Sequence, residues 1–119
     1  MIFGDVLKGL GDKLDGLVGV VVMGMDGIPI ERHLKGTGPN FDILATEATG
    51  LLRSSVQASN ELNAGNLKEL VVQTDGLTML AVAITEEYVL LAALRPDSNY
   101  GRARFYLKRA ALTLEKEFV

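Results

Sequence analysis

The sequence predicts a single α/β domain of the α+β class, in which one five-stranded antiparallel sheet is flanked by three helices. Two observations lead to this prediction. Five short, mostly apolar runs are interrupted by turn signals such as Asp26-Gly27 and Asp75-Gly76, and three longer stretches repeat apolar residues at helical spacing. The resulting order is α-β-β-α-β-β-β-α, and no linker, internal repeat or low-complexity run divides residues 1–119.

Residues 2–14 predict an amphipathic helix, because their apolar side chains recur at helical spacing. Each of its glycines weakens a helix by about 1 kcal/mol relative to alanine, so this helix must depend on docking for its stability. A β-hairpin follows, with strands at residues 17–25 and 28–34. The first strand is apolar on both faces and therefore central, whereas Pro29 places the second at an edge of the sheet.

The longest predicted element is a helix over residues 41–62, with Asn40 as its N-cap. A broad apolar arc follows this helix, and small side chains line the middle of the arc. Such an arc suits a helix that touches both a sheet and a second helix, and it equally suits a broadly buried face of a monomer. The pattern alone does not choose between these two interpretations.

A three-stranded meander is predicted at residues 67–74, 77–85 and 88–94. The first of these strands keeps Lys68 and Glu69 among its apolar residues and is therefore the second edge, while the other two must lie deep. A final helix over residues 99–118 carries a continuous apolar stripe that would close the domain.

Two apolar residues of this final helix, Phe105 and Leu112, lie opposite its core stripe and among cationic side chains. Coverage by neighbouring elements, the first helix included, is the favoured interpretation of this pair. The alternative is an exposed contact surface.

Composition narrows the class of protein. The 119 residues include no cysteine, which excludes disulfides, thiolate metal sites and cysteine nucleophiles. The formal net charge of −3 and the interspersed cations argue against nucleic acid as a partner. No uninterrupted apolar run is long enough for membrane insertion, and the first residues do not resemble a signal peptide, so we expect a cytoplasmic protein.

The sequence offers no convincing catalytic, metal-binding or cofactor-binding group. His33 is the only histidine, and without a second ligand we interpret it as a surface side chain. The glycine-containing loop at residues 36–40 lacks the lysine of a Walker motif, and Glu86-Glu87 falls in a predicted turn where both carboxylates are solvated. We therefore expect no enzyme activity, no metal and no bound nucleotide in this chain.

The order of elements, the turn Met25-Asp26-Gly27-Ile28-Pro29-Ile30 and the helix start Asn99-Tyr100-Gly101-Arg102 resemble the roadblock/dynein light chain family. The likeness covers nearly the whole chain. Within the family, the chain looks most similar to the bacterial and archaeal MglB-type members. It implies a profilin-like sheet with the long helix on one face and the terminal helices on the other.

The resemblance also implies a homodimer, in which the long helix packs beside its twin and the strands at residues 67–74 pair into one continuous sheet. The residues assigned to this dimer or partner interface are Leu44, Ala48, Leu51, Leu52, Ser55, Ser59, Leu62, Lys68, Leu70 and Val72.

The family's MglB-type members imply a small Ras-like GTPase as partner, whose nucleotide cycle or localisation the dimer would modulate. Arg53, on the polar side of the long helix, is the candidate contact. One alternative is a structural, light-chain-like subunit of a motor or motility complex without GTPase regulation. Another is a small-molecule sensor or enzyme, which would need a pocket with converging polar groups that the buried strands do not supply.

Overall fold

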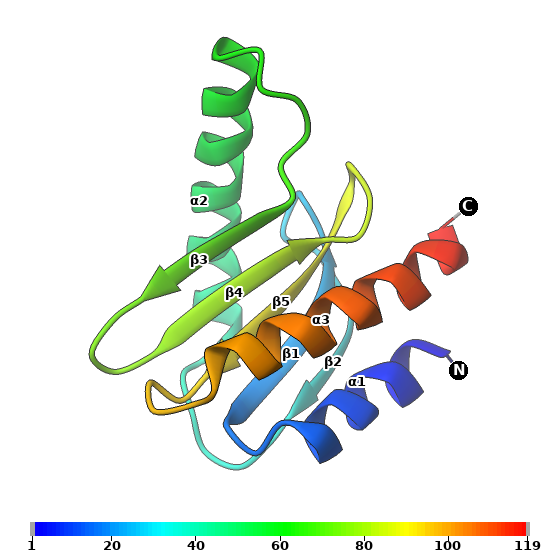
Figure 1. Cartoon of the computed structure of the whole chain (residues 1–119), viewed down its shortest axis with the longest axis vertical. Coiled ribbons are helices and arrows are strands. Elements are labelled where there is room, and N and C mark those ends of the chain that lie inside the picture. The colour runs from blue at the N-terminus through cyan, green and yellow to red at the C-terminus, as the bar shows by residue number, and fades with distance from the viewer. Residues whose placement is uncertain (1, 119) are drawn as a thin grey trace.

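The computed structural model describes residues 2–118 and confirms the predicted order of elements (Figure 1). The helices are α1 (Ile2–Lys13), α2 (Phe41–Glu61) and α3 (Tyr100–Glu115), followed by a 3₁₀ turn, η1 (Lys116–Phe118). The strands are β1 (Leu17–Gly24), β2 (Pro29–Leu34), β3 (Glu69–Gln73), β4 (Thr78–Ala83) and β5 (Tyr88–Leu94). Among residues 2–118, no helix combines the length and the apolar character of a membrane-spanning segment.

The five strands form one antiparallel sheet in the order β2-β1-β5-β4-β3. The hairpin and the meander therefore join through β1 and β5, and both predicted edge strands, β2 and β3, lie at the edges. Because β1 is central, its successive side chains face two different layers: Val20 and Val22 contact one core cluster, while Val21 and Met23 contact the other.

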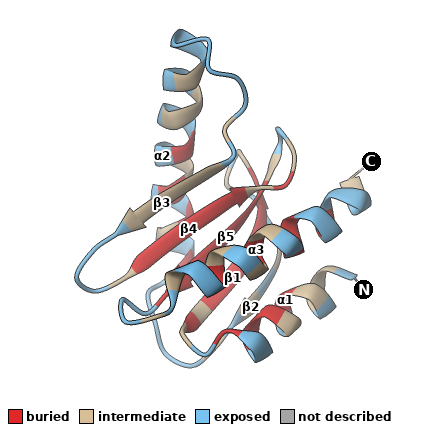
Figure 2. Cartoon of the chain, in the orientation of Figure 1, coloured by how far each residue is buried: buried red, intermediate tan, exposed pale blue. Residues whose placement is uncertain are grey.

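The helices cover both faces of the sheet, as the resemblance implied. One core cluster joins the sheet to α1 and α3, with Leu7, Leu107 and Leu114 fully buried in it. The other joins the sheet to α2 through Phe41, Ala45, Ala48 and Leu52. Figure 2 shows this burial concentrated on the central strands, whereas the C-terminal end of α2 extends past the sheet and is largely exposed.

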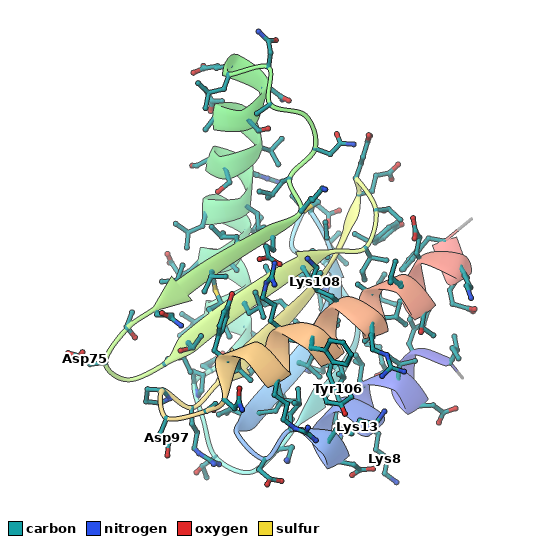
Figure 3. All side chains as sticks on the ribbon, in the orientation of Figure 1. Lys8, Lys13, Asp75, Asp97, Tyr106 and Lys108 are labelled. Atoms are coloured by element: carbon teal, nitrogen blue, oxygen red, sulfur yellow. The ribbon has the colours of Figure 1, made fainter. Side chains whose placement is uncertain are left out.

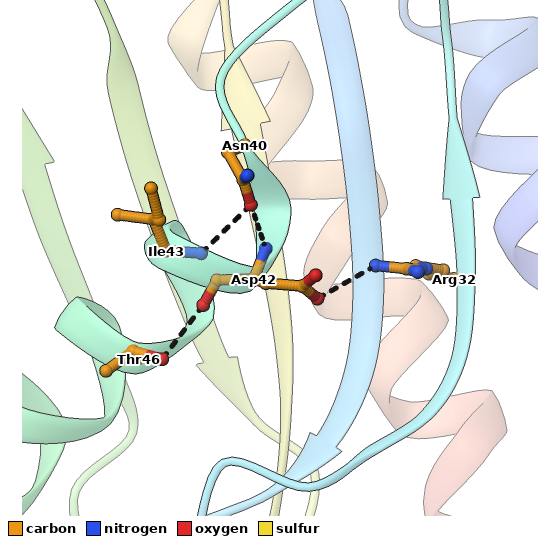
Figure 4. Close-up of polar contacts among 5 residues, drawn as sticks. All are labelled: Arg32, Asn40, Asp42, Ile43 and Thr46. Atoms are coloured by element: carbon orange, nitrogen blue, oxygen red, sulfur yellow. Dashed lines mark hydrogen bonds and ion pairs between the residues drawn. The ribbon is translucent and has the colours of Figure 1, made fainter.

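The start of α2 is fixed by its predicted N-cap. The side-chain oxygen of Asn40 accepts hydrogen bonds from the backbone N–H groups of Asp42, at 2.9 Å, and Ile43, at 3.2 Å (Figure 4). These bonds satisfy donors that have no partner inside the helix. Asp42 also forms an ion pair of 3.3 Å with Arg32, which links the first turn of α2 to β2.

Helix α1 docks through β2 and the residue that follows it. The Nζ of Lys35 donates to the carbonyl oxygens of Gly11, at 2.7 Å, and Leu14, at 3.3 Å, at the C-terminal end of α1. The prediction for His33 needs correction: it is half-buried, and a Cβ at Gly11 would lie 2.8 Å from its Nε2. Because Gly11 has no side chain, the imidazole of His33 can pack directly against α1.

The two ends of the described chain meet through aromatic rings. Phe118 of η1 stacks on Tyr88 with ring centroids 4.1 Å apart, and its centroid lies 5.4 Å from that of Phe3. The last three residues of the predicted final helix thus form a 3₁₀ turn. This turn brings Phe118 against both α1 and the start of β5.

Candidate protein interface on α2 and β3

Helix α2 carries apolar side chains that its own chain leaves exposed. Leu51 is 44% exposed, Leu62 is 76% exposed and Ile43 is 62% exposed. Such exposure of large apolar residues along one helix marks a surface for another molecule. The interpretation of the whole arc as a buried face of a monomer is therefore wrong for Leu51 and Leu62.

Exposed and half-buried residues along one side of α2 follow the spacing of a helix that packs against another helix. We define the α2 stripe as Leu44, Leu51, Ser55, Ala58 and Leu62. Their separations of seven, four, three and four residues keep them on one side of the helix and match the seam of a two-helix contact. Ser55 and Ala58 are small, so a second helix has room to approach closely at the middle of the stripe.

The residues assigned to the interface from the sequence divide into three groups. Leu51, Leu62 and Lys68 are exposed, while Leu44, Ser55, Ser59, Leu70 and Val72 are half-buried. Ala48 and Leu52, at 0% and 1% exposure, belong to the chain's own core and offer no surface to a partner. The assignment of Ala48 and Leu52 to the interface is therefore wrong, because they lie on the part of the apolar arc that faces the sheet. Ala58 was missed, although it occupies the outer margin of the same arc, and Ile43 was missed because it lies about 100° around the helix from Leu44.

Strand β3 contributes an open edge. Its residues pair with β4 in a continuous antiparallel register from Glu69 opposite Val82 to Gln73 opposite Thr78. Among the described residues, no strand pairs with its other side. An edge of this kind presents unpaired backbone N–H and C=O groups that another strand can join.

The α2 stripe and the open edge of β3 lie on the same side of the molecule. Leu44 of the stripe packs against the same core cluster as Leu70 and Val72 of β3. The opposite flank of α2 faces β2, because a Cβ at Gly27, in the β1–β2 turn, would lie 2.8 Å from Thr49 Oγ1. Arg53 is exposed and follows Thr49 by one helical turn, so it lies on the β2 flank, away from the stripe.

An ion pair that local patterns did not reveal anchors β3 from the other face of the sheet. Glu69 accepts a hydrogen bond of 2.8 Å from the Nε of Arg104 on α3, and its second carboxylate oxygen lies 3.7 Å from the Nζ of Lys108. This hydrogen bond and the negative charge of Glu69 raise the pKa of Arg104. The outer strand is thereby tied to α3 while its free edge stays open.

A groove of about 560 Å³ lies between the projecting half of α2 and the end of the sheet that carries β3. Apolar side chains such as Leu52, Val56 and Val89 line it together with the polar Asn60 and Asn66. The volume of the groove is in the range of ligand sites. Among residues 2–118, no three His, Cys, Asp or Glu side chains gather closely enough to hold a metal ion.

Phe105 and Leu112 of α3 contradict the favoured sequence interpretation. Neither α1 nor any other described element covers them, and they are 56% and 65% exposed. The core stripe of α3 consists of Ala103, Leu107, Ala110, Ala111 and Leu114. Phe105 and Leu112 lie outside that stripe and form a surface feature on the side of the sheet opposite α2.

The comparisons with known proteins agree with this architecture. Two uncharacterized proteins of Methanocaldococcus jannaschii are each 25% identical over 108 residues, which is 90% of this chain and 92% of theirs. The gliding protein mglB from Thermus thermophilus superposes with a TM-score of 0.87 at 17% identity, over 97% of this chain and 87% of that chain. MglC from Myxococcus xanthus superposes with a TM-score of 0.71 at 25% identity, over 98% and 99% of the two chains.

The family assignment rests on the sequence as well as on the fold. The model of the Roadblock/LC7 domain matches residues 4–94, from the start of α1 to the end of β5. This segment contains the exposed helix, the open edge strand and every strand of the sheet. The chain belongs to the Roadblock/LC7 domain family.

Proposed function

We propose that this chain is a non-catalytic regulatory protein that forms a homodimer through the α2 stripe and β3. The dimer binds a small Ras-like GTPase and modulates its nucleotide cycle or its localisation. The observation that carries the proposal is the exposed α2 stripe beside an open strand edge, in a chain of the Roadblock/LC7 family. Both features are surfaces for a protein partner rather than sites of chemistry.

A two-fold axis beside the stripe would use both features at once. In such a dimer each copy of α2 packs against its twin, and the two β3 strands pair edge to edge. Full removal of a leucine side chain from water contributes about 2 kcal/mol, and Leu51 and Leu62, at 44% and 76% exposure, would each contribute a part of that value in both copies. The backbone groups of β3 would gain partners in the same step.

The nucleotide would belong to the partner. The chain's loop at residues 36–40 lacks a phosphate-binding lysine, and the similarity to MglB and MglC favours a Ras-like GTPase as the protein that is bound. Arg53 is the candidate contact because it is exposed on the flank of α2 that a dimer at the stripe would leave free. Its cation would act by positioning groups of the GTPase.

The experiment has two steps. Light scattering on the purified chain should give twice the mass of one chain, and the measurement is then repeated with candidate small GTPases loaded with GDP or with a GTP analogue. Binding together with a changed rate of GTP hydrolysis or nucleotide exchange supports the proposal. A dimer that binds no GTPase but co-purifies within a large motility assembly favours a structural light-chain-like subunit instead. A monomer at high concentration overturns both.

A further inference from the structure

A second surface lies on α3, across the sheet from the α2 stripe. Phe105 and Leu112 project from its outer side, seven residues apart, and are 56% and 65% exposed. Hollows of about 240 and 380 Å³ adjoin Leu112 on its two sides. Leu112 therefore stands beside space that apolar side chains of another molecule can enter.

Three cations interleave with this apolar pair. Arg102, Phe105, Arg109 and Leu112 of α3 and Lys116, the first residue of η1, follow one another at spacings of three and four residues. All five are exposed. At about 100° per residue they occupy one narrow strip of the helix surface. The guanidinium of Arg109 lies 5.6 Å from the centroid of the Phe105 ring, so charge and apolar surface are in contact. We call these five residues the α3 strip.

The positive charge is reinforced beside the α3 strip. The ring of Tyr106 has the Nζ of Lys13 at 5.3 Å, the guanidinium of Arg102 at 4.8 Å and that of Arg109 at 5.9 Å from its centroid. Figure 3 shows Lys13 and Tyr106 side by side between α1 and α3. The ion pairs of the described chain involve Arg32, Arg95 and the two cations bound to Glu69, so none includes Lys13, Arg102 or Arg109. Asp5 lines the hollow between α1 and α3 that Lys13 and Arg109 share, and it is the carboxylate beside this cluster.

We propose that the α3 strip binds an acidic amphipathic helix of a partner protein. Apolar positions that alternate with cations at helical spacing are complementary to a helix whose apolar positions alternate with carboxylates. The strip extends over ~21 Å, which matches about four turns of such a helix. This proposal is independent of the dimer and of the GTPase, because α3 and α2 cover opposite faces of the sheet.

Helix α1 favours a narrow partner over a membrane. Asp5 and Asp12 are exposed, lie seven residues apart and point away from the buried side of α1, which contains Leu7 and Leu10. A flat anionic bilayer that touched the α3 strip would also meet these carboxylates in the same helical layer. A single helix is about 10 Å wide and can contact α3 without covering α1.

The test uses the full chain and two synthetic peptides of about 18 residues each. In the first, leucine occupies the first and fourth positions of each seven-residue repeat and glutamate flanks them. In the second, every glutamate is replaced by lysine. Fluorescence anisotropy should show binding of the glutamate peptide that weakens with salt, and little binding of the lysine peptide. No binding of the glutamate peptide at concentrations on the order of 1 mM overturns the proposal.

Two variants locate the binding. The double variant Phe105→Ser with Leu112→Ser should bind the glutamate peptide about 30-fold or more weakly, because it loses the central apolar anchors. The double charge reversal Arg109→Glu with Lys116→Glu should weaken binding of the glutamate peptide and strengthen binding of the lysine peptide. Ile28→Ser with Leu34→Ser is the matched control, because those residues are 65% and 49% exposed and lie just before β2 and at its end, outside the α3 strip.

The remaining outcomes also decide the matter. Equal binding of both peptides, or unchanged binding by both variants, contradicts the proposal. Vesicles of about 70% phosphatidylcholine and 30% phosphatidylserine test the membrane alternative. Binding to these vesicles that depends on Phe105 and Leu112 would overturn the proposal and assign the α3 strip to a lipid surface. A larger assembly in light scattering that Phe105→Ser abolishes would assign the strip to a second copy of the chain.

Discussion

Glu69 on β3 lies 2.8 Å from the Nε of Arg104 on α3, which fastens the outermost strand of the sheet to a helix on one face. The same strand presents Leu70 and Val72 to the other face, beside α2. The position of β3 is thus fixed from both faces, while its outer edge has no strand partner among residues 2–118. A strand held in this way can pair with a second strand without first becoming ordered, which lowers the entropic cost of association.

Replacing Glu69 with glutamine should loosen this edge. The neutral amide cannot balance Arg104 and Lys108, so we expect a lower melting temperature and faster hydrogen exchange at the amides of β3. The pKa of Arg104 is raised, so its charge, and its contribution to stability, are lost only as the pH rises through that high value. The effect of Glu69→Gln should therefore be the same at neutral and at mildly alkaline pH.

A matched control is available at another surface ion pair. Asp97 lies 3.5 Å from the Nε of Arg95, and its side chain is 80% exposed. Asp97→Asn should change neither the melting temperature nor the exchange of β3, because exposed pairs contribute little. If both variants behave alike, the half-buried position of Glu69 has no special role.

Replacing Asn40 with alanine should destabilise the start of α2. The side chain accepts two backbone hydrogen bonds that alanine cannot replace, and loss of such a cap costs about 1 kcal/mol. Urea denaturation should show this loss in the free energy of unfolding. Asn40→Asp keeps an acceptor at the same position and should retain most of the stability, so equal losses in the two variants would contradict the capping role.

The elements of this fold were predictable because each is specified by neighbouring residues. Turn dipeptides placed the hairpins, and Pro29 marked β2 as an edge because proline cannot donate to a second strand. Apolar spacing placed all three helices, with boundaries that differ from the structure by a few residues. These signals act within a few positions along the chain, so one sequence carries them.

Exposure at the candidate interface was less predictable, because it depends on where a helix sits over the sheet. Leu51 and Leu52 are adjacent and chemically identical, yet the first is 44% exposed and the second 1%. Phe105 was expected to be covered, but α1 packs along the other flank of α3, where Tyr106 and Ala110 lie. The ion pair of Glu69 with Arg104 joins residues 35 positions apart, and no local pattern indicates such a contact.

Replacing Leu51 and Leu62 with glutamate should convert the proposed dimer into a monomer. The charges would be forced into an apolar contact between two α2 helices, where an unpaired carboxylate costs several kcal/mol. Neither side chain belongs to the buried core of one chain, because Leu51 is 44% and Leu62 76% exposed, so far-UV circular dichroism should be unchanged. Light scattering should report one chain for this variant and two for the control Ile28→Glu, which alters a side chain that is 65% exposed just before β2. A dimer that survives both leucine substitutions would place the contact elsewhere.

Replacing Arg53 with alanine should leave the dimer intact and reduce its effect on the partner GTPase. Arg53 is exposed on the flank of α2 that faces β2, and the α2 stripe lies on the other flank. Removal of one charged contact from an interface of this kind weakens binding by about tenfold and mainly affects the salt dependence. Titration of the GTPase at low and high salt, alongside the rate of GTP hydrolysis, measures both quantities. Arg53→Lys separates the two roles, because it keeps the charge but loses the planar fork that positions phosphate or carboxylate groups. If Arg53→Ala binds and modulates the GTPase as well as the unaltered chain does, Arg53 is not the contact, and the partner must dock on another part of the dimer.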